Sequence, residues 1–236
     1  MRVFLKSVVG ALIVLLSVQA QAQDEARYGY GIKAGISVSS FSSNVPHAGP
    51  KIGYTLGGFG TYVITPVFTL LTEINYLQQG GSLLTYLDET RFGAPSNFFT
   101  VNQTHSNVTL HTLEMPVMLQ YTLPFEDLPI KVSAGPSFSY VVDATDNFQR
   151  TGYTATNVIV TTSGTDNVKS TYESFQIGAT GNLGFFIPFG GKTINIDARY
   201  MYGITPIRKN YSYITLNNNS EELRANSIVF TVGLTF

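Results

Sequence analysis

The chain has 236 residues, of which 12% are charged, and it contains no cysteine. Soluble domains usually have about 25% charged residues, so this chain is poor in charge. The net charge of −1 gives no electrostatic footprint for nucleic acid, and the lack of cysteine excludes a disulfide framework, a thiolate zinc site and a thiol nucleophile.

Residues 1–22 have the features of a cleavable signal peptide. Arg2 and Lys6 give a basic start, an apolar run follows, and small residues precede position 23. The apolar run is too short to span a bilayer as a helix. A buried N-terminal helix is the alternative. We expect a mature chain that leaves the cytoplasm and begins with a short periplasmic segment, residues 23–29.

The remaining residues, 30–236, divide into eight strand-like runs in which apolar and polar residues alternate with a period of two. No run has a helical period, and no later stretch of about 18 apolar residues could form a spanning helix. Each run has about the 9–11 residues that a tilted strand needs to cross a bilayer, or a few more. The predicted strands are 30–41, 53–64, 67–78, 108–121, 130–142, 172–187, 193–203 and 226–236.

The connections between these runs alternate in length. Those at 65–66, 122–129 and 188–192 are short and rich in Pro and Gly, whereas the other four are longer and rich in Ser, Thr and Asn. Short turns on one side and long loops on the other are typical of an outer-membrane barrel. The pattern predicts an all-β fold, an eight-stranded antiparallel up-and-down transmembrane β-barrel with short periplasmic turns and long outer loops.

The charged residues favour a membrane barrel over a soluble sandwich with solvated charges, which remains the alternative. Six of them, three of each sign, fall on the polar face at mid-strand among Gly and Ser. A narrow eight-stranded lumen is filled by side chains, and charges inside it must be paired. We predict a lumen charge network of Lys33, Glu73, Glu114, Lys131, Asp197 and Arg199.

Aromatic residues gather near both ends of the predicted strands, as expected for two membrane-interface belts. The short-turn belt is predicted to contain Tyr62, Phe68, Tyr121, Phe189 and Phe236, and the long-loop belt Phe41, Tyr54, Tyr76, Tyr140 and Tyr202. The last strand ends on Phe236 with an unbroken apolar face. We predict that Phe236 is the signal by which the barrel-assembly machinery recognises the chain.

The long loop at 143–171 is ambiguous. Its segment 153–164 is rich in β-forming residues. It would either extend two neighbouring strands beyond the membrane as a hairpin, or add a strand pair and give ten strands. We favour eight strands.

The chain resembles the PorT-like outer-membrane β-barrel proteins over nearly the whole mature sequence. The resemblance rests on YGIKAGISVSSF, LEMPVML, KVSAGPSFSYVV, FQIGATGNLGFFIP and DARYMYGITPI, in this order. It implies an integral barrel in the outer membrane. It also implies a possible link to protein secretion, because the member that names the family takes part in a secretion and gliding system.

Motifs for catalysis or cofactors find little support. PFGGKT at 188–193 is not a phosphate loop, because position 186 is Phe and a strand follows, and GGFG at 57–60 lacks a βαβ unit. His111, Ser174 and Glu173 could form a lipid-modifying site at the outer rim. We expect no catalytic, cofactor or metal site.

The sequence therefore predicts a barrel with a structural or interaction role, a filled lumen and no open pore, and the alternative is a lipid-modifying enzyme. The expected partners are outer-membrane lipid, the assembly machinery, and secretion or surface proteins. Nucleic acid is not among them.

Overall fold

The computed structural model describes residues 27–41, 48–86, 100–124, 130–153, 158–212 and 220–236. The predicted signal peptide lies outside the described residues. Within those ranges no helix has the length and apolarity needed to cross a bilayer. Apart from the 3₁₀ turn η2 (Lys169–Thr171), the elements are the strands β1 (Tyr28–Phe41), β2 (Lys51–Val63), β3 (Phe68–Tyr86), β4 (Thr100–Thr122), β5 (Ile130–Tyr153), β6 (Ile159–Asn167), β7 (Phe175–Phe189), β8 (Lys192–Gly203), β9 (Arg208–Ser212), β10 (Ser220–Leu223) and β11 (Ala225–Thr235).

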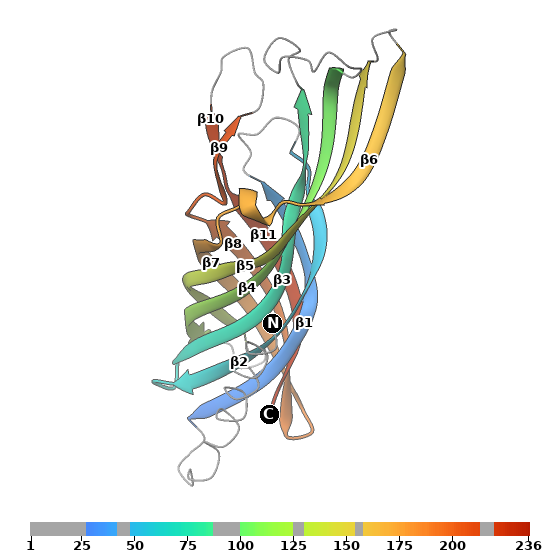
Figure 1. Ribbon diagram of the computed structural model, residues 1–236. Helices are drawn as coiled ribbons and strands as arrows, with labels where there is room; N and C mark the ends of the chain where they lie inside the picture. The colour runs from blue at the N-terminus through green and yellow to red at the C-terminus, as the bar shows by residue number, and fades with distance from the viewer. Residues whose placement is uncertain (1–26, 42–47, 87–99, 125–129, 154–157, 213–219) are drawn as a thin grey trace, which may run out of the picture.

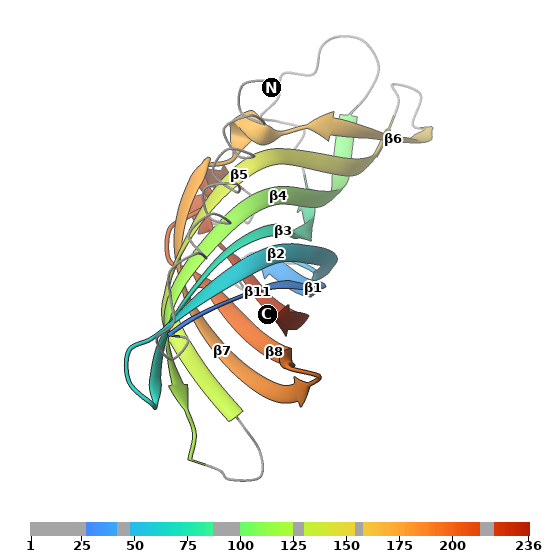
Figure 2. The same cartoon turned by 90° about the horizontal axis from the view of Figure 1, so that it is seen from below.

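Eight of these strands form a closed antiparallel barrel (Figures 1 and 2). Neighbours in sequence pair around the ring in the order β1, β2, β3, β4, β5, β7, β8 and β11. The first and last strands close it, since Gly31 pairs with Thr235 and Phe41 pairs with Ala225. Closure leaves no unpaired edge within the ring. The predicted eight-stranded up-and-down barrel is confirmed.

The turns at one end of the barrel are short. The tightest joins β7 to β8 through Gly190 and Gly191, whose φ angles of 55° and 78° lie in the left-handed region. A two-residue hairpin needs such angles at both positions, and glycine adopts them without strain. The segment that resembles a phosphate loop is therefore this turn. Strand β1 begins, and strand β11 ends, at the same short-turn end as this hairpin.

Several strands run farther than the sequence predicts at the long-loop end. The outer parts of β3, β4 and β5 (78–86, 100–112 and 143–153) run from the upper lumen past the rim of the barrel, and β6 pairs with the outer part of β5. We call these three segments and β6 the flange (Figure 1). The ambiguous loop is thus an extended hairpin rather than a ninth and tenth barrel strand. A second small hairpin, β9–β10, rises from the same end of the barrel (Figure 1).

Alternation along the strands sets an inner and an outer face. Ile32, Ile36 and Phe230 expose about half of their side chains on the outer face, whereas Ser37 and Thr231 are buried on the inner face. A soluble sandwich would bury its apolar face, so the structure has the reverse arrangement, as in a membrane barrel.

Most of the predicted belt residues lie on the outer face. At the short-turn end the Phe68 and Tyr121 rings are 5.2 Å apart, and at the long-loop end the Tyr54 and Tyr76 rings are 5.7 Å apart. Phe41 is the exception, because it is 2% exposed and points into the lumen. The prediction for Phe41 was wrong.

Candidate functional site

The middle of the lumen holds a buried charge cluster. Glu73 on β3 accepts through one oxygen from Lys33 on β1 at 2.5 Å and from Arg199 on β8 at 2.7 Å. Asn75 donates to the same oxygen at 2.8 Å. Arg199 also lies 3.7 Å from the carboxylate of Glu114 on β4. These ionic side chains are all at most 5% exposed, so the cluster has almost no contact with solvent.

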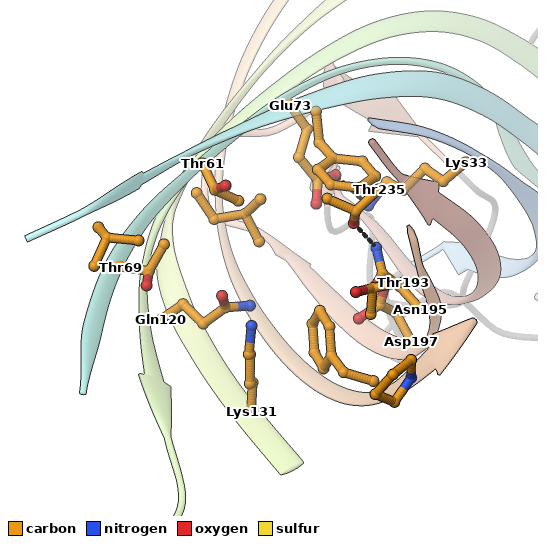
Figure 3. A pocket seen from close by; sticks show the side chains of 15 residues that line it. Lys33, Thr61, Thr69, Glu73, Gln120, Lys131, Thr193, Asn195, Asp197 and Thr235 are labelled. Carbon is orange, nitrogen blue, oxygen red and sulfur yellow. Dashed lines mark hydrogen bonds and ion pairs between the residues drawn. The ribbon is translucent and has the colours of Figure 1, made fainter. Parts of the chain in front are cut away.

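The structure thus brings four of the six predicted lumen charges together. Lys131 and Asp197 lie apart from this cluster, toward the short-turn end. The ammonium of Lys131 stands 3.9 Å from the centre of the Phe186 ring, and Asp197 accepts a hydrogen bond from Asn182 at 3.1 Å. They line the cavity shown in Figure 3, whose volume is about 270 Å³.

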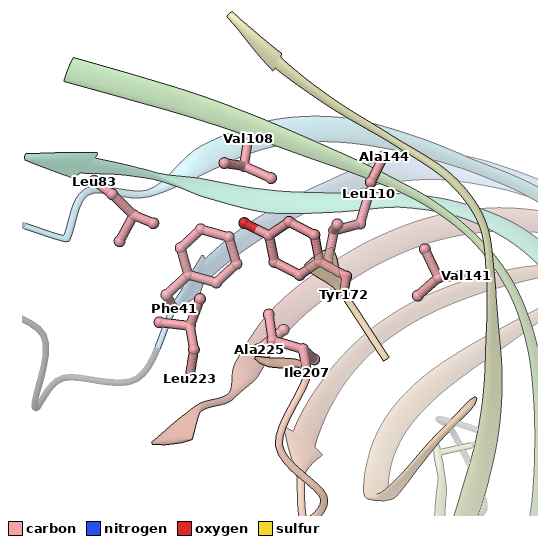
Figure 4. Packing of buried hydrophobic residues seen from close by; sticks show 10 residues of the cluster. All are labelled: Phe41, Leu83, Val108, Leu110, Val141, Ala144, Tyr172, Ile207, Leu223 and Ala225. Atoms are coloured by element: carbon pink, nitrogen blue, oxygen red, sulfur yellow. The ribbon is translucent and has the colours of Figure 1, made fainter. Parts of the chain in front are cut away.

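An apolar cluster occupies the lumen at the long-loop end, and sequence reasoning missed it. Its members come from the barrel strands, from β10 and from the segments that precede β7 and β9 (Figure 4). It consists of Phe41, Leu83, Val108, Leu110, Val141, Ala144, Tyr172, Ile207, Leu223 and Ala225, each at most 7% exposed. The signal was present in the alternation: Phe41 has the same parity as Lys33, Ser37 and Ser39, so it belongs to the lumen face.

A smaller apolar layer lies in the same lumen. Leu77, Met201 and Val229 are 0–7% exposed and form a second cluster. Leu77 is four residues from Glu73 on β3, and Val229 is two residues from Thr231 on β11, so both side chains point into the lumen. The inner face therefore changes from polar to apolar along the barrel axis, and a cavity lies at its polar, short-turn end.

The three residues of the possible lipid-modifying site each have a contact with another part of the chain. His111 faces outward on β4, and its Nδ1 lies 2.5 Å from the hydroxyl of Tyr76. Ser174 accepts a backbone hydrogen bond from Val141, and Glu173 donates one from its backbone to Ile207. The histidine nitrogen is thus engaged by a tyrosine. In the described part of the chain, no group of three or more His, Asp or Glu side chains could hold a metal ion.

Phe236 sits at the short-turn end with 44% of its surface exposed. Its backbone N–H donates to the carbonyl of Tyr30 at 2.9 Å, and the two rings stack with centres 5.8 Å apart. Lys192 places its ammonium 4.5 Å from the centre of the Phe236 ring. The terminal aromatic is thus tied to the closing seam while its ring stays accessible. Its role as an assembly signal stays a prediction.

The chain is similar to several solved structures. Ail, the attachment invasion locus protein of Yersinia pestis, is 9% identical, with a TM-score of 0.39 over 88% of this chain and 98% of that one. Neisserial surface protein A is 13% identical, with a TM-score of 0.42 over 87% and 95% of the two chains. The N-terminal barrel domain of OprF from Pseudomonas aeruginosa is 15% identical, with a TM-score of 0.31 over 87% and 99%.

No functionally curated protein matches the sequence. The family model described as outer membrane protein beta-barrel domain matches residues 19–209, which is most of the chain. The match covers the strands from β1 to the start of β9, and therefore the charge cluster and the cavity residues except those of β11. The chain belongs to the outer membrane protein beta-barrel domain family and is an integral protein of the outer membrane.

Proposed function

We propose that this protein is a non-catalytic interaction barrel whose lumen conducts no ions and whose outer flange binds a partner protein. The flange is the observation that carries the proposal. Among the described residues, β6 pairs with β5 on one side and has no strand on the other. A free strand edge presents unpaired N–H and C=O groups that can pair with an extended segment of another chain.

The composition of β6 supports strand addition at this edge. Its sequence is IVTTSGTDN, with one charged residue, and nearly all of it is exposed. Natural edges are commonly blunted by lysine, proline or a bulge, and β6 has none of these devices. Thr162 and Gly164 pair with Arg150 and Phe148 on β5, and the Arg150 guanidinium stacks on the Phe148 ring at 3.9 Å.

The interior of the barrel supports a surface role rather than transport. A stable pore would need a continuous polar path, and both apolar layers and the Glu73 ion pairs stand across the lumen. We also propose that the outward apolar face contacts outer-membrane lipid and that Phe236 contacts the assembly machinery. The resemblance to PorT-like proteins supports a place in that branch of the family, with a component of a secretion assembly as the flange partner.

A site-specific cross-linking experiment tests this proposal. A photo-reactive residue is placed in living cells at Ser163 on β6, and for comparison at Phe189, the last residue of β7 before the periplasmic turn. We expect a discrete protein adduct from Ser163 only. An adduct from Phe189 alone would move the partner to the periplasmic side and refute the flange proposal.

A pair of matched variants then separates the free edge from the charge of the flange. Thr161 and Ser163 on β6 pair with Thr151 and Gln149 on β5. Because Ser163 is itself replaced in the first variant, the photo-reactive residue is moved to Thr165. Thr161→Lys/Ser163→Lys on β6 should then abolish the adduct, because lysines blunt a strand edge. The matched variant Gln149→Lys/Thr151→Lys on β5 should leave the yield of the adduct unchanged. Equal losses would mean that charge, not the edge, governs binding.

A further inference from the structure

The cavity at the periplasmic end of the lumen has no part in the proposed surface role. Its volume of about 270 Å³ lies at the small end of ligand pockets, which usually have about 300–1,000 Å³. Lumen residues at the periplasmic mouth, such as Val63 and Pro188, contribute to its lining, and Glu73 lies at its inner wall. The cavity is therefore accessible from the periplasm and has room for a small molecule.

One wall of the cavity carries hydrogen-bond donors. Lys131 on β5 and Gln120 on β4 point toward one another across its lower part (Figure 3). Within the part of the chain that the structure describes, Lys131 has no ion-pair partner within 4 Å. Its ammonium lies over the face of Phe186, and Asp197 attracts it from farther away. An ammonium has three donors and no acceptor, so this wall needs an acceptor such as a carboxylate.

The opposite wall carries acceptors on β8. The carboxylate of Asp197 accepts one hydrogen bond, from Asn182. Asn195 is 3% exposed, its amide nitrogen donates to Thr235, and its amide oxygen has no partner among the described residues. A buried acceptor without a donor is costly, and a cation that carries several N–H groups would satisfy both oxygens.

The strand register keeps the two walls apart. Lys131 pairs with Gly184 on β7, and Gly184 pairs with Asp197, so the three residues form one row. Lys131 and Asp197 are thus two strands apart, roughly 9–10 Å between their backbones. A Cβ at Gly184 would lie 2.4 Å from the Asp197 carboxylate. The missing side chain at Gly184 therefore leaves room for the Asp197 carboxylate and for the edge of the Phe186 ring, both of which line the cavity.

We propose that this cavity binds a small zwitterion from the periplasm, an amino acid or a dipeptide. The carboxylate of the ligand meets Lys131 and Gln120, and its ammonium meets Asp197 and Asn195. The aromatic rings of Phe59 and Phe186 line the space and strengthen both contacts by excluding water. The charges in and beside the cavity favour this class of ligand.

Those charges already balance, three against three: Lys33, Lys131 and Arg199 against Glu73, Glu114 and Asp197. A ligand with a net charge would add an uncompensated charge to a poorly solvated lumen, which is costly. A zwitterion leaves the sum at zero and satisfies both poles at once.

The test uses the complete barrel in lipid nanodiscs, with alanyl-alanine as the probe and binding followed by titration calorimetry. Two blocked probes, N-acetyl-alanyl-alanine and alanyl-alanine amide, each lack one charge. We expect saturable binding of the free dipeptide, and binding weaker by about tenfold or more for each blocked form, since each loses a charge-assisted contact. These probes need no altered protein, so a folding defect cannot obscure the result.

Variants then assign the two poles. Lys131→Met should weaken the free dipeptide but not the amide, and Asp197→Asn should weaken the free dipeptide but not the acetylated form. Lys192→Met is the matched control, because Lys192 is also a periplasmic lysine over an aromatic ring but lies outside the cavity. The proposal is overturned if the free dipeptide does not saturate, if the blocked forms bind equally well, or if Lys192→Met weakens binding as much as Lys131→Met.

Discussion

Replacing Glu73 by glutamine should strongly destabilise the barrel. One carboxylate oxygen of Glu73 accepts from Lys33 at 2.5 Å, Arg199 at 2.7 Å and Asn75 at 2.8 Å, and all four side chains are buried. Glutamine keeps the size of the side chain but removes its charge. Two cations would then face each other, with only the more distant Glu114 and Asp197 left to compensate them.

Two independent considerations give the same magnitude. Removing one partner of a buried ion pair usually costs about 3–5 kcal/mol. Unit charges about 4 Å apart interact by about 4 kcal/mol at an effective dielectric constant of about 20. We therefore expect the free energy of unfolding to fall by about 3–5 kcal/mol in Glu73→Gln.

Urea unfolding of the barrel in lipid vesicles measures this change. The folded fraction is read from its faster migration on unheated gels, and the free energy is extrapolated linearly to zero urea. The control is Glu222→Gln, which breaks an exposed pair with Arg224 at 3.1 Å and should leave the transition unchanged. The double variant Lys33→Met/Glu73→Gln should recover part of the loss, because it removes one unpaired cation.

A result within experimental error of the wild-type protein would refute this reasoning. It would mean that water, rather than the fold, compensates the charges. The lumen around Glu73 would then contain water, and the buried ion pairs would no longer support a closed barrel.

Three further predictions concern other parts of the barrel. Leu110→Ala, in the fully buried apolar cluster, should lower the free energy of unfolding by about 2–5 kcal/mol in the same urea assay, and a loss no larger than for lipid-facing Leu113→Ala would contradict it. Deleting Phe236 should reduce the amount of folded barrel in the outer membrane while Phe236→Tyr restores it; unchanged assembly after deletion would exclude the signal role. In the flange, half-burial raises the pKa of the Asp146 carboxyl above its usual range, so ionisation disfavours the folded flange. Stability contributed by the protonated form is lost as pH rises from the unfolded-state pKa through the raised folded-state pKa. Compared with the wild-type protein, Asp146→Asn should therefore slow hydrogen exchange of the flange amides at neutral pH, but not at a pH below the usual pKa range of aspartate. Equal exchange rates in the two proteins at neutral pH would contradict this prediction.

Alternation along each strand was sufficient to predict the barrel and the side of the sheet on which each charge lies. The face of a strand residue depends only on its parity, so Lys33, Glu73 and Arg199 could be assigned to the lumen without a structure. The same rule would have placed Phe41 there. It was assigned to the outer belt because its aromatic character and its place at a strand end outweighed its parity.

The contacts within the lumen could not be predicted. Glu73 and Arg199 are 126 residues apart in sequence. They meet because of the register with which the ring closes, and a period of two does not specify that register. For the same reason the cavity between Lys131 and Asp197, with Gly184 between them, appeared only in the structure.

The flange was also only partly foreseen. Its strand segments lie beyond the membrane-spanning lengths, where both faces are polar enough for the alternation to fade. The residues 100–107 and 143–153 therefore resembled loop in composition, although they form ladders with their neighbours. Pairing with an adjacent strand, rather than local preference, decides their conformation.

The most direct test of a closed interaction barrel is its ion conductance in a planar lipid bilayer. The apolar layers and the buried ion pairs predict that the purified full-length protein gives no stable open channel at any applied voltage that the bilayer tolerates. A reproducible, long-lived channel of constant conductance, present at the wild-type sequence and absent from a mock preparation, would contradict the closed lumen and the function proposed from it.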